Sequence, residues 1–122
     1  MEEALFDALE AADAEMEARH GGRFPLHPAR PAHGAAARRQ YDGLFAFEAG
    51  FSPGFGSEAG PGYALTFRIA TLADVPADFR AAFEKEAVAA LKTQLARHLP
   101  ERRLEIVRDG AAWKIVGDLS LN

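Results

Sequence analysis

The sequence contains no cysteine among its 122 residues. Disulfide bonds, thiolate metal sites and cysteine nucleophiles are therefore excluded, and a zinc site would need histidines and carboxylates. No segment approaches the roughly 20 apolar residues that a membrane-spanning helix needs. The amino terminus also lacks a basic region followed by an apolar run. Together these absences predict a soluble, cytoplasmic protein that does not associate with membranes.

Acidic and basic residues are separated along the chain, whose formal net charge is −4. Residues 1–18 carry seven acids and no base, whereas residues 19–39 carry five arginines and no acid. Because duplex affinity rests largely on Lys and Arg neutralising phosphates, an acidic protein is a poor candidate for nucleic-acid binding. The excess of arginine over lysine and the abundance of alanine favour a GC-rich bacterial source. The length suits a single domain covering residues 1–122.

Two segments show the 3.6-residue periodicity of amphipathic helices. The first covers residues 2–19, and the second runs over residues 77–99, between Pro76 and Pro100. The expected buried stripes are Leu5, Leu9, Ala12 and Met16 in the first helix, and Phe79, Phe83, Ala87, Val88, Leu91, Leu95 and Leu99 in the second.

Alternating apolar residues predict a first β-hairpin between these helices, with strands around Phe45–Phe51 and Tyr63–Thr71. One face of each strand is aromatic or aliphatic and is expected to join the core. The opposite face is small and only weakly polar, with Ala46 and Glu48 on one strand and Ala64 on the other. Such a face can meet water or a second copy of the chain.

A second hairpin is predicted around Asp109-Gly110, a dipeptide that suits a type I′ turn because it tolerates positive φ at both central positions. This turn would pair Glu105 with Lys114 on the outer face of the sheet. The residues expected on the core face are Leu104, Ile106, Trp113 and Ile115, with Ile106 opposite Trp113.

The resulting order α-β-β-α-β-β predicts an α+β fold with a four-stranded, mainly antiparallel sheet and two helices packed on one face. This order is similar to that of secretion-chaperone-like and other small α+β dimers, an analogy of fold that carries no function. The exposed sheet face and edge strands lead us to expect a homodimer or another homo-oligomer, or a protein partner.

The segment at about residues 21–40 is rich in Pro, Arg and His and shows no periodicity, so we expect a loop that is functional, mobile or extended across the surface. Its histidines, with His20, have spacings that match no metal-binding motif, and no metal site is predicted. Arg38 and Arg39 are candidates for binding a phosphate or carboxylate. The alternative is a solvated loop, or pairing with the acidic first helix.

The connection within the first hairpin, residues 50–62, is rich in glycine. The amides of Gly54 and Gly56 and the hydroxyl of Ser57 could converge on an anion. However, the segment lacks a Gly-Lys-Ser/Thr ending and joins two strands, so no helix amino terminus is available for phosphate. The plainer interpretation is a long hairpin loop whose glycines supply unusual φ angles.

No combination of residues in the sequence forms a recognisable catalytic motif, so no catalytic residue and no cofactor are predicted. The leading hypothesis is a small, non-enzymatic interaction module that self-associates or binds a protein partner through an open sheet face or an edge strand. The alternative is a protein or enzyme that binds a small anionic ligand with the glycine-rich loop and the two arginines.

Overall fold

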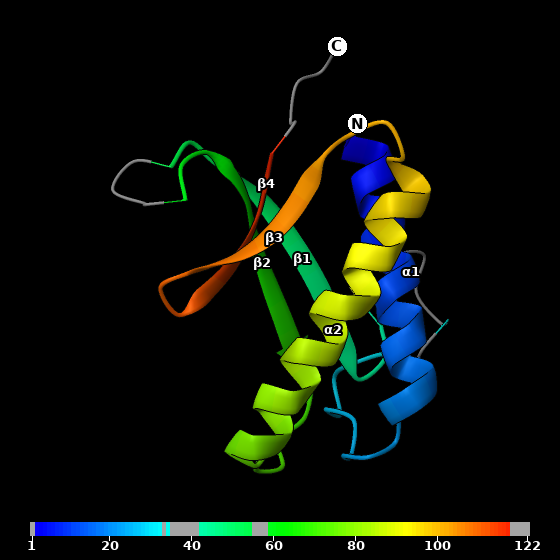
Figure 1. Cartoon of the computed structure of the whole chain (residues 1–122). Coiled ribbons are helices and arrows are strands. Elements are labelled where there is room, and N and C mark those ends of the chain that lie inside the picture. Colours follow the sequence, from blue (N-terminus) through cyan, green and yellow to red (C-terminus); the bar gives the residue numbers. More distant parts are fainter. Residues whose placement is uncertain (1, 33, 35–41, 55–58, 118–122) are drawn as a thin grey trace.

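The computed structural model describes residues 2–32, 34, 42–54 and 59–117 (Figure 1). The elements follow the order α1 (Glu2–His20), β1 (Phe45–Ser52), β2 (Gly62–Ile69), α2 (Ala77–His98), β3 (Leu104–Asp109) and β4 (Ala112–Gly117). The strands form one antiparallel sheet in the order β1-β2-β4-β3, and both helices pack on the same face. The predicted α+β fold is confirmed. No helix in the described part of the chain is long and apolar enough to cross a membrane.

The core lies between the two helices and the sheet, where the apolar stripes predicted from the sequence meet. The ring of Phe83 in α2 stacks on Phe45 in β1, with 4.6 Å between the ring centroids. Phe47 and Phe67 pack edge to face across β1 and β2 at 4.9 Å. The fully buried large side chains of the cluster come from four elements and include Leu5, Met16, Phe45, Phe83, Leu91 and Ile115.

The two hairpins are joined edge to edge by β2 and β4. This ladder pairs only three residues on each strand, from Tyr63 opposite Ile115 to Leu65 opposite Trp113. Gly62 begins β2 so close to β4 that a Cβ there would lie 2.3 Å from the carbonyl oxygen of Ile115. A side chain at this position would therefore push the two hairpins apart.

The second hairpin has a different register from the one predicted. Its two-residue loop is Gly110-Ala111, so Asp109 pairs with Ala112 and Ile106 with Ile115. Among the described residues only glycines have positive φ, and Gly110 has a φ of 64°. A type II′ turn needs positive φ only at its first central position, whereas the predicted type I′ turn needs it at both.

This correction moves each pairing by two positions, so every side chain keeps the predicted face. Leu104, Ile106, Trp113 and Ile115 all contact the core as expected. The predicted pair of Glu105 with Lys114 is wrong, because Glu105 lies opposite Val116 and Lys114 opposite Val107.

The described part of the segment between α1 and β1 is fixed against the start of the first hairpin. The guanidinium of Arg30 donates hydrogen bonds to the carbonyl oxygens of Asp42, Gly43 and Phe45, at 2.9, 3.0 and 3.3 Å. The amide of His27 donates to the carbonyl of Ala70 at 2.8 Å. The basic loop thus covers one end of the sheet.

The turn geometry predicts different effects for two glycine-to-alanine substitutions. Gly110→Ala places a Cβ at positive φ and should lower the free energy of unfolding by about 1 kcal/mol. Gly50→Ala is the matched control, since its φ is ordinary and its added Cβ meets nothing within 4 Å. We expect the control to be neutral or slightly stabilising. Urea unfolding monitored by circular dichroism measures both, and equal effects would contradict the type II′ assignment.

Candidate functional site

The two backbone segments at the base of the glycine-rich loop, residues 52–54 and 60–62, lie close together. We call this base the neck of the loop. Gly54 has a φ of 87°, and a Cβ there would lie 2.2 Å from the carbonyl carbon of Gly60. The hydroxyl oxygen of Ser52 accepts a hydrogen bond from the amide of Gly54 at 3.3 Å. Gly54 therefore serves the close approach of two backbone segments. Gly56 and Ser57 lie outside the described residues.

Lys114 in β4 contacts this neck at Gly60. Its side chain lies on the face of the sheet opposite the helices, yet the residue is only 2% exposed. The Nζ atom donates a hydrogen bond to the carbonyl oxygen of Gly60 at 2.7 Å and lies 3.4 Å from Oδ2 of Asp109. A charge-assisted bond to a buried carbonyl and a nearby carboxylate together offset the cost of burying the ammonium group. This lysine fastens the loop to the second hairpin.

The anion pocket predicted from the sequence is not assembled within the described residues. Arg38 and Arg39 lie outside them. Arg30, the described arginine nearest to them in the sequence, is engaged by three backbone carbonyls. Binding of a small anion by the glycine-rich loop therefore stays a prediction.

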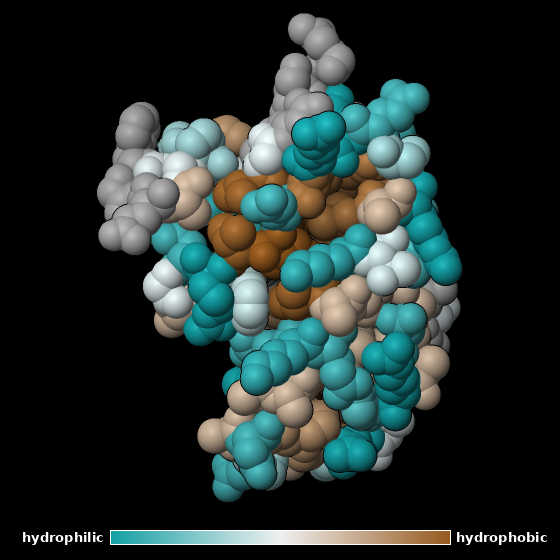
Figure 2. All heavy atoms as spheres, in the orientation of Figure 1, coloured by the Kyte–Doolittle hydropathy of each residue, from teal (hydrophilic) through white to brown (hydrophobic). Residues whose placement is uncertain are grey.

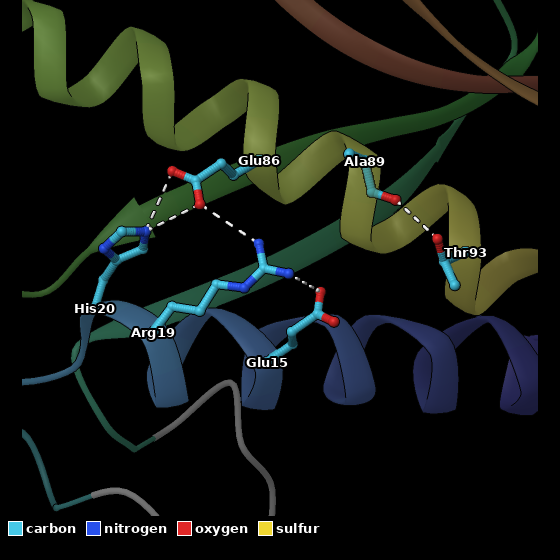
Figure 3. Close-up of polar contacts among 6 residues, drawn as sticks. All are labelled: Glu15, Arg19, His20, Glu86, Ala89 and Thr93. Carbon is cyan, nitrogen blue, oxygen red and sulfur yellow. Dashed lines mark hydrogen bonds and ion pairs between the residues drawn. The ribbon is translucent and has the colours of Figure 1, made fainter.

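Two histidines in the described part of the chain, His20 and His27, have structural contacts. Nε2 of His20 lies 3.2 Å from both carboxylate oxygens of Glu86, and Nη1 of Arg19 lies 3.4 Å from Oε1 of the same carboxylate. Figure 3 shows these side chains pointing toward one another from the two helices. The His20 ring packs edge to face on Phe79 and Phe83. These contacts tie the end of α1 to α2, and the His20 side chain is only 15% exposed.

No group of three or more His, Cys, Asp or Glu side chains in the described residues is arranged to hold a metal ion. Nδ1 of His27 accepts a hydrogen bond from the amide of Ala29 at 3.0 Å, which closes a turn in the basic loop.

An exposed aromatic side chain marks the far end of β1. Phe51 is 61% exposed and packs edge to face on Tyr63 in β2, with 5.8 Å between the rings. Burial raises the pKa of the Tyr63 hydroxyl, and the nearby negative charge of Glu2 and a hydrogen bond to it raise it further. The phenol therefore stays protonated at neutral pH and serves as a hydrogen-bond donor.

A groove of about 540 Å³ lies between the first half of α2 and the end of the second hairpin. The indole N–H of Trp113 donates to Oε1 of Glu84 at 2.9 Å, and the Arg108 guanidinium lies over the Trp113 ring at 4.6 Å. Sequence reasoning missed this cluster because it paired Trp113 with Ile106, whereas Trp113 and Arg108 are in fact cross-strand partners.

Comparisons with known proteins identify relatives of the whole chain. A protein-family model described as "Uncharacterised protein" matches residues 1–117. A protein of Borreliella burgdorferi named "Uncharacterized protein" is 34% identical over 116 residues, which cover 95% of this chain and 91% of that protein. No solved structure matches the chain. The family description and the relative's name indicate no function.

The contacts of Lys114 predict a cost for removing its charge. Lys114→Met keeps most of the side-chain length but leaves the Gly60 carbonyl without this donor, and should lower the free energy of unfolding by about 1–3 kcal/mol. Lys92→Met is the control, because Lys92 is exposed and should change stability by less than about 0.5 kcal/mol. Urea unfolding of both variants tests this, and equal losses would contradict the role given to Lys114.

Proposed function

The chain belongs to the family described as "Uncharacterised protein", and we propose that it is a small, non-enzymatic interaction module that self-associates through the open end of strand β1. The observation that carries this proposal is the outer edge of β1 over residues 48–52, which are half-buried or exposed, include the exposed ring of Phe51 and pair with no described strand on that side. We propose that β1 of a second copy of the chain pairs with this edge.

The two ends of β1 differ in how they are covered. Phe45, Ala46 and Phe47 are buried, and Arg30 caps the carbonyl of Phe45. From Glu48 to Ser52 the residues are half-buried or exposed, and no described strand pairs with this side of β1. An edge strand presents unpaired N–H and C=O groups that can pair with another chain.

The composition of the two edge strands favours β1 over β3. Charged side chains on an edge discourage pairing, and three of the six residues of β3 are charged: Glu105, Arg108 and Asp109. In β1 only Glu48 is charged among eight residues. All eight residues of β1 are paired continuously with β2, so no bulge interrupts this edge.

Self-pairing also satisfies the side chains at the open end of β1. If the β1 strands of two copies pair antiparallel with Gly50 opposite Gly50, counting along the strands places Ala49 opposite Phe51 and Glu48 opposite Ser52 of the other copy. A small residue then faces a large aromatic one, and the two carboxylates are kept apart. The same patch is used on both copies, as in the isologous interface of a two-fold dimer.

The two large hydrophobic side chains that are exposed in the described residues provide a matched test. Phe51→Lys should raise the dissociation constant of the dimer by about 100-fold, because burial of each Phe contributes about 1.5–3 kcal/mol. Leu72→Lys makes the same change at a leucine that is 74% exposed and follows the end of β2 that pairs with Phe45, at the opposite end of β1 from Phe51. This variant should leave the dimer intact. Sedimentation equilibrium measures both constants.

Two outcomes of this experiment would contradict the proposal. A wild-type protein that stays monomeric at about 1 mM would exclude self-association as its function, since this affinity corresponds to only about 4 kcal/mol. A dimer that is weakened by Leu72→Lys and not by Phe51→Lys would place the interface elsewhere.

A further inference from the structure

Helix α2 and the second hairpin form a wedge that is open to solvent. In Figure 1, α2 and β3 lie close together near the turn that joins them and diverge toward the other end of the helix. A cavity of about 100 Å³ lies at the narrow end, beside Leu95 and Leu104, and the groove of about 540 Å³ lies at the wide end. The two cavities share no lining residue, and each lies between α2 and the chain of β3 or the turn before it.

Apolar residues make up about half of the lining of the wedge. Figure 2 shows hydrophobic surface gathered between α2 and the second hairpin, crossed and flanked by hydrophilic side chains. The apolar lining residues of the two cavities are Ala77, Ala81, Leu95, Ala96, Leu104, Ala111 and Trp113. Such a surface favours a ligand that brings apolar side chains of its own.

The charged lining residues of the wedge are almost all basic. Five of them are cations: Arg80, Lys85, Lys92, Arg102 and Arg108. Among the described residues that line the two cavities Glu84 is the one acid, and its carboxylate already accepts the Trp113 indole N–H and lies 3.8 Å from Arg108. The wedge is therefore a basic region in a protein whose net charge is −4.

Three of these cations have no acidic partner within the part of the chain that the structure describes. Arg80, Lys85 and Lys92 form no ion pair with a described residue. At 1.5 Å per residue, Arg80 and Lys92 are roughly 18 Å apart along α2, or about three helical turns. Lys85 and Lys92 are seven residues apart, so they form a basic row on one side of α2, about two turns long, and Arg80 lies farther round the helix. A single phosphate needs donors that converge, whereas this row matches acids spread along a peptide.

We propose that the wedge between α2 and the second hairpin binds an acidic amphipathic helix of a protein partner. The apolar side of that helix would pack against Trp113 and Leu104, and its acids would face the basic row on α2. This is the helix-in-groove mode of peptide recognition, with charge complementarity selecting the partner. The site is independent of the proposed self-association, since β1 and β3 are opposite edges of the sheet.

The single tryptophan of the chain lies in this wedge and reports directly on its occupation. The probe is an unlabelled peptide of about 15 residues, roughly four helical turns, with leucines at helical spacing and glutamates elsewhere. We expect it to change the fluorescence emission of Trp113 saturably, with an affinity that weakens as salt rises. A peptide with glutamine in place of every glutamate should bind about tenfold more weakly or worse.

Charge reversals on the same helix locate the site. Lys85→Glu should weaken binding of the glutamate peptide by about tenfold. Arg97→Glu is the matched control, because Arg97 is exposed on α2 and lines neither cavity, and it should retain the wild-type affinity. Phe51→Lys should also retain it, which separates this site from the dimer interface.

Each of the remaining outcomes would overturn the proposal. These are an unchanged Trp113 emission at about 1 mM peptide, equal binding of the glutamine peptide, and equal effects of Lys85→Glu and Arg97→Glu. A response to inorganic phosphate alone that displaces the peptide would show instead that the wedge takes a small anion.

Discussion

The antiparallel pairing of β2 with β4 is the contact on which the arrangement of this protein depends. Each hairpin can form from local sequence, but only this ladder makes them one sheet with β1 and β3 at its edges. The ladder is three pairs long, and the backbone of β4 approaches Gly62 too closely for a side chain there. The short ladder lets the second hairpin diverge from α2, and the wedge is the gap that results (Figure 1).

The same ladder explains why Lys114 is buried on a face that the sequence assigns to solvent. Lys114 lies opposite Ala64 in β2, close to the neck of the glycine-rich loop, and its ammonium group reaches the carbonyl of Gly60. A lysine in this position is stable because Asp109 lies nearby and the carbonyl accepts its hydrogen bond. The glycines at the neck therefore have a packing role that periodicity alone does not indicate.

Local periodicity was sufficient to predict the elements and most of their buried faces, because helical and strand spacing depend only on neighbours along the chain. The exception is Phe51, which shares the aromatic face expected in the core but is 61% exposed near the end of β1. It did not distinguish the two possible turns of the second hairpin, since Asp109, Gly110 and Ala111 permit either. The alternatives differ by two positions in pairing and place the same side chains in the core, so the apolar pattern cannot choose between them.

What differs between the two turns is the cross-strand partner of Trp113, and with it the cluster of Trp113, Arg108 and Glu84. That cluster joins residues from three elements, α2, β3 and β4, and the periodicity of one element alone does not indicate it. Of the predicted anion site, only Gly54 lies in the described residues, where its positive φ and close contact with Gly60 fit the plainer interpretation of the loop.

The two proposed surfaces differ in what opposes unwanted binding. At the open end of β1 the only charge is Glu48, so shape and backbone hydrogen bonds decide what pairs with it. In the wedge the apolar lining alone would attract many hydrophobic segments, and the basic row on α2 restricts them to acidic ones. Because the protein as a whole is acidic, its own copies are repelled from each other at long range, and a second copy has to be recognised through close contacts. An edge strand with a single charge suits that task, whereas a basic groove suits a partner with acids of its own.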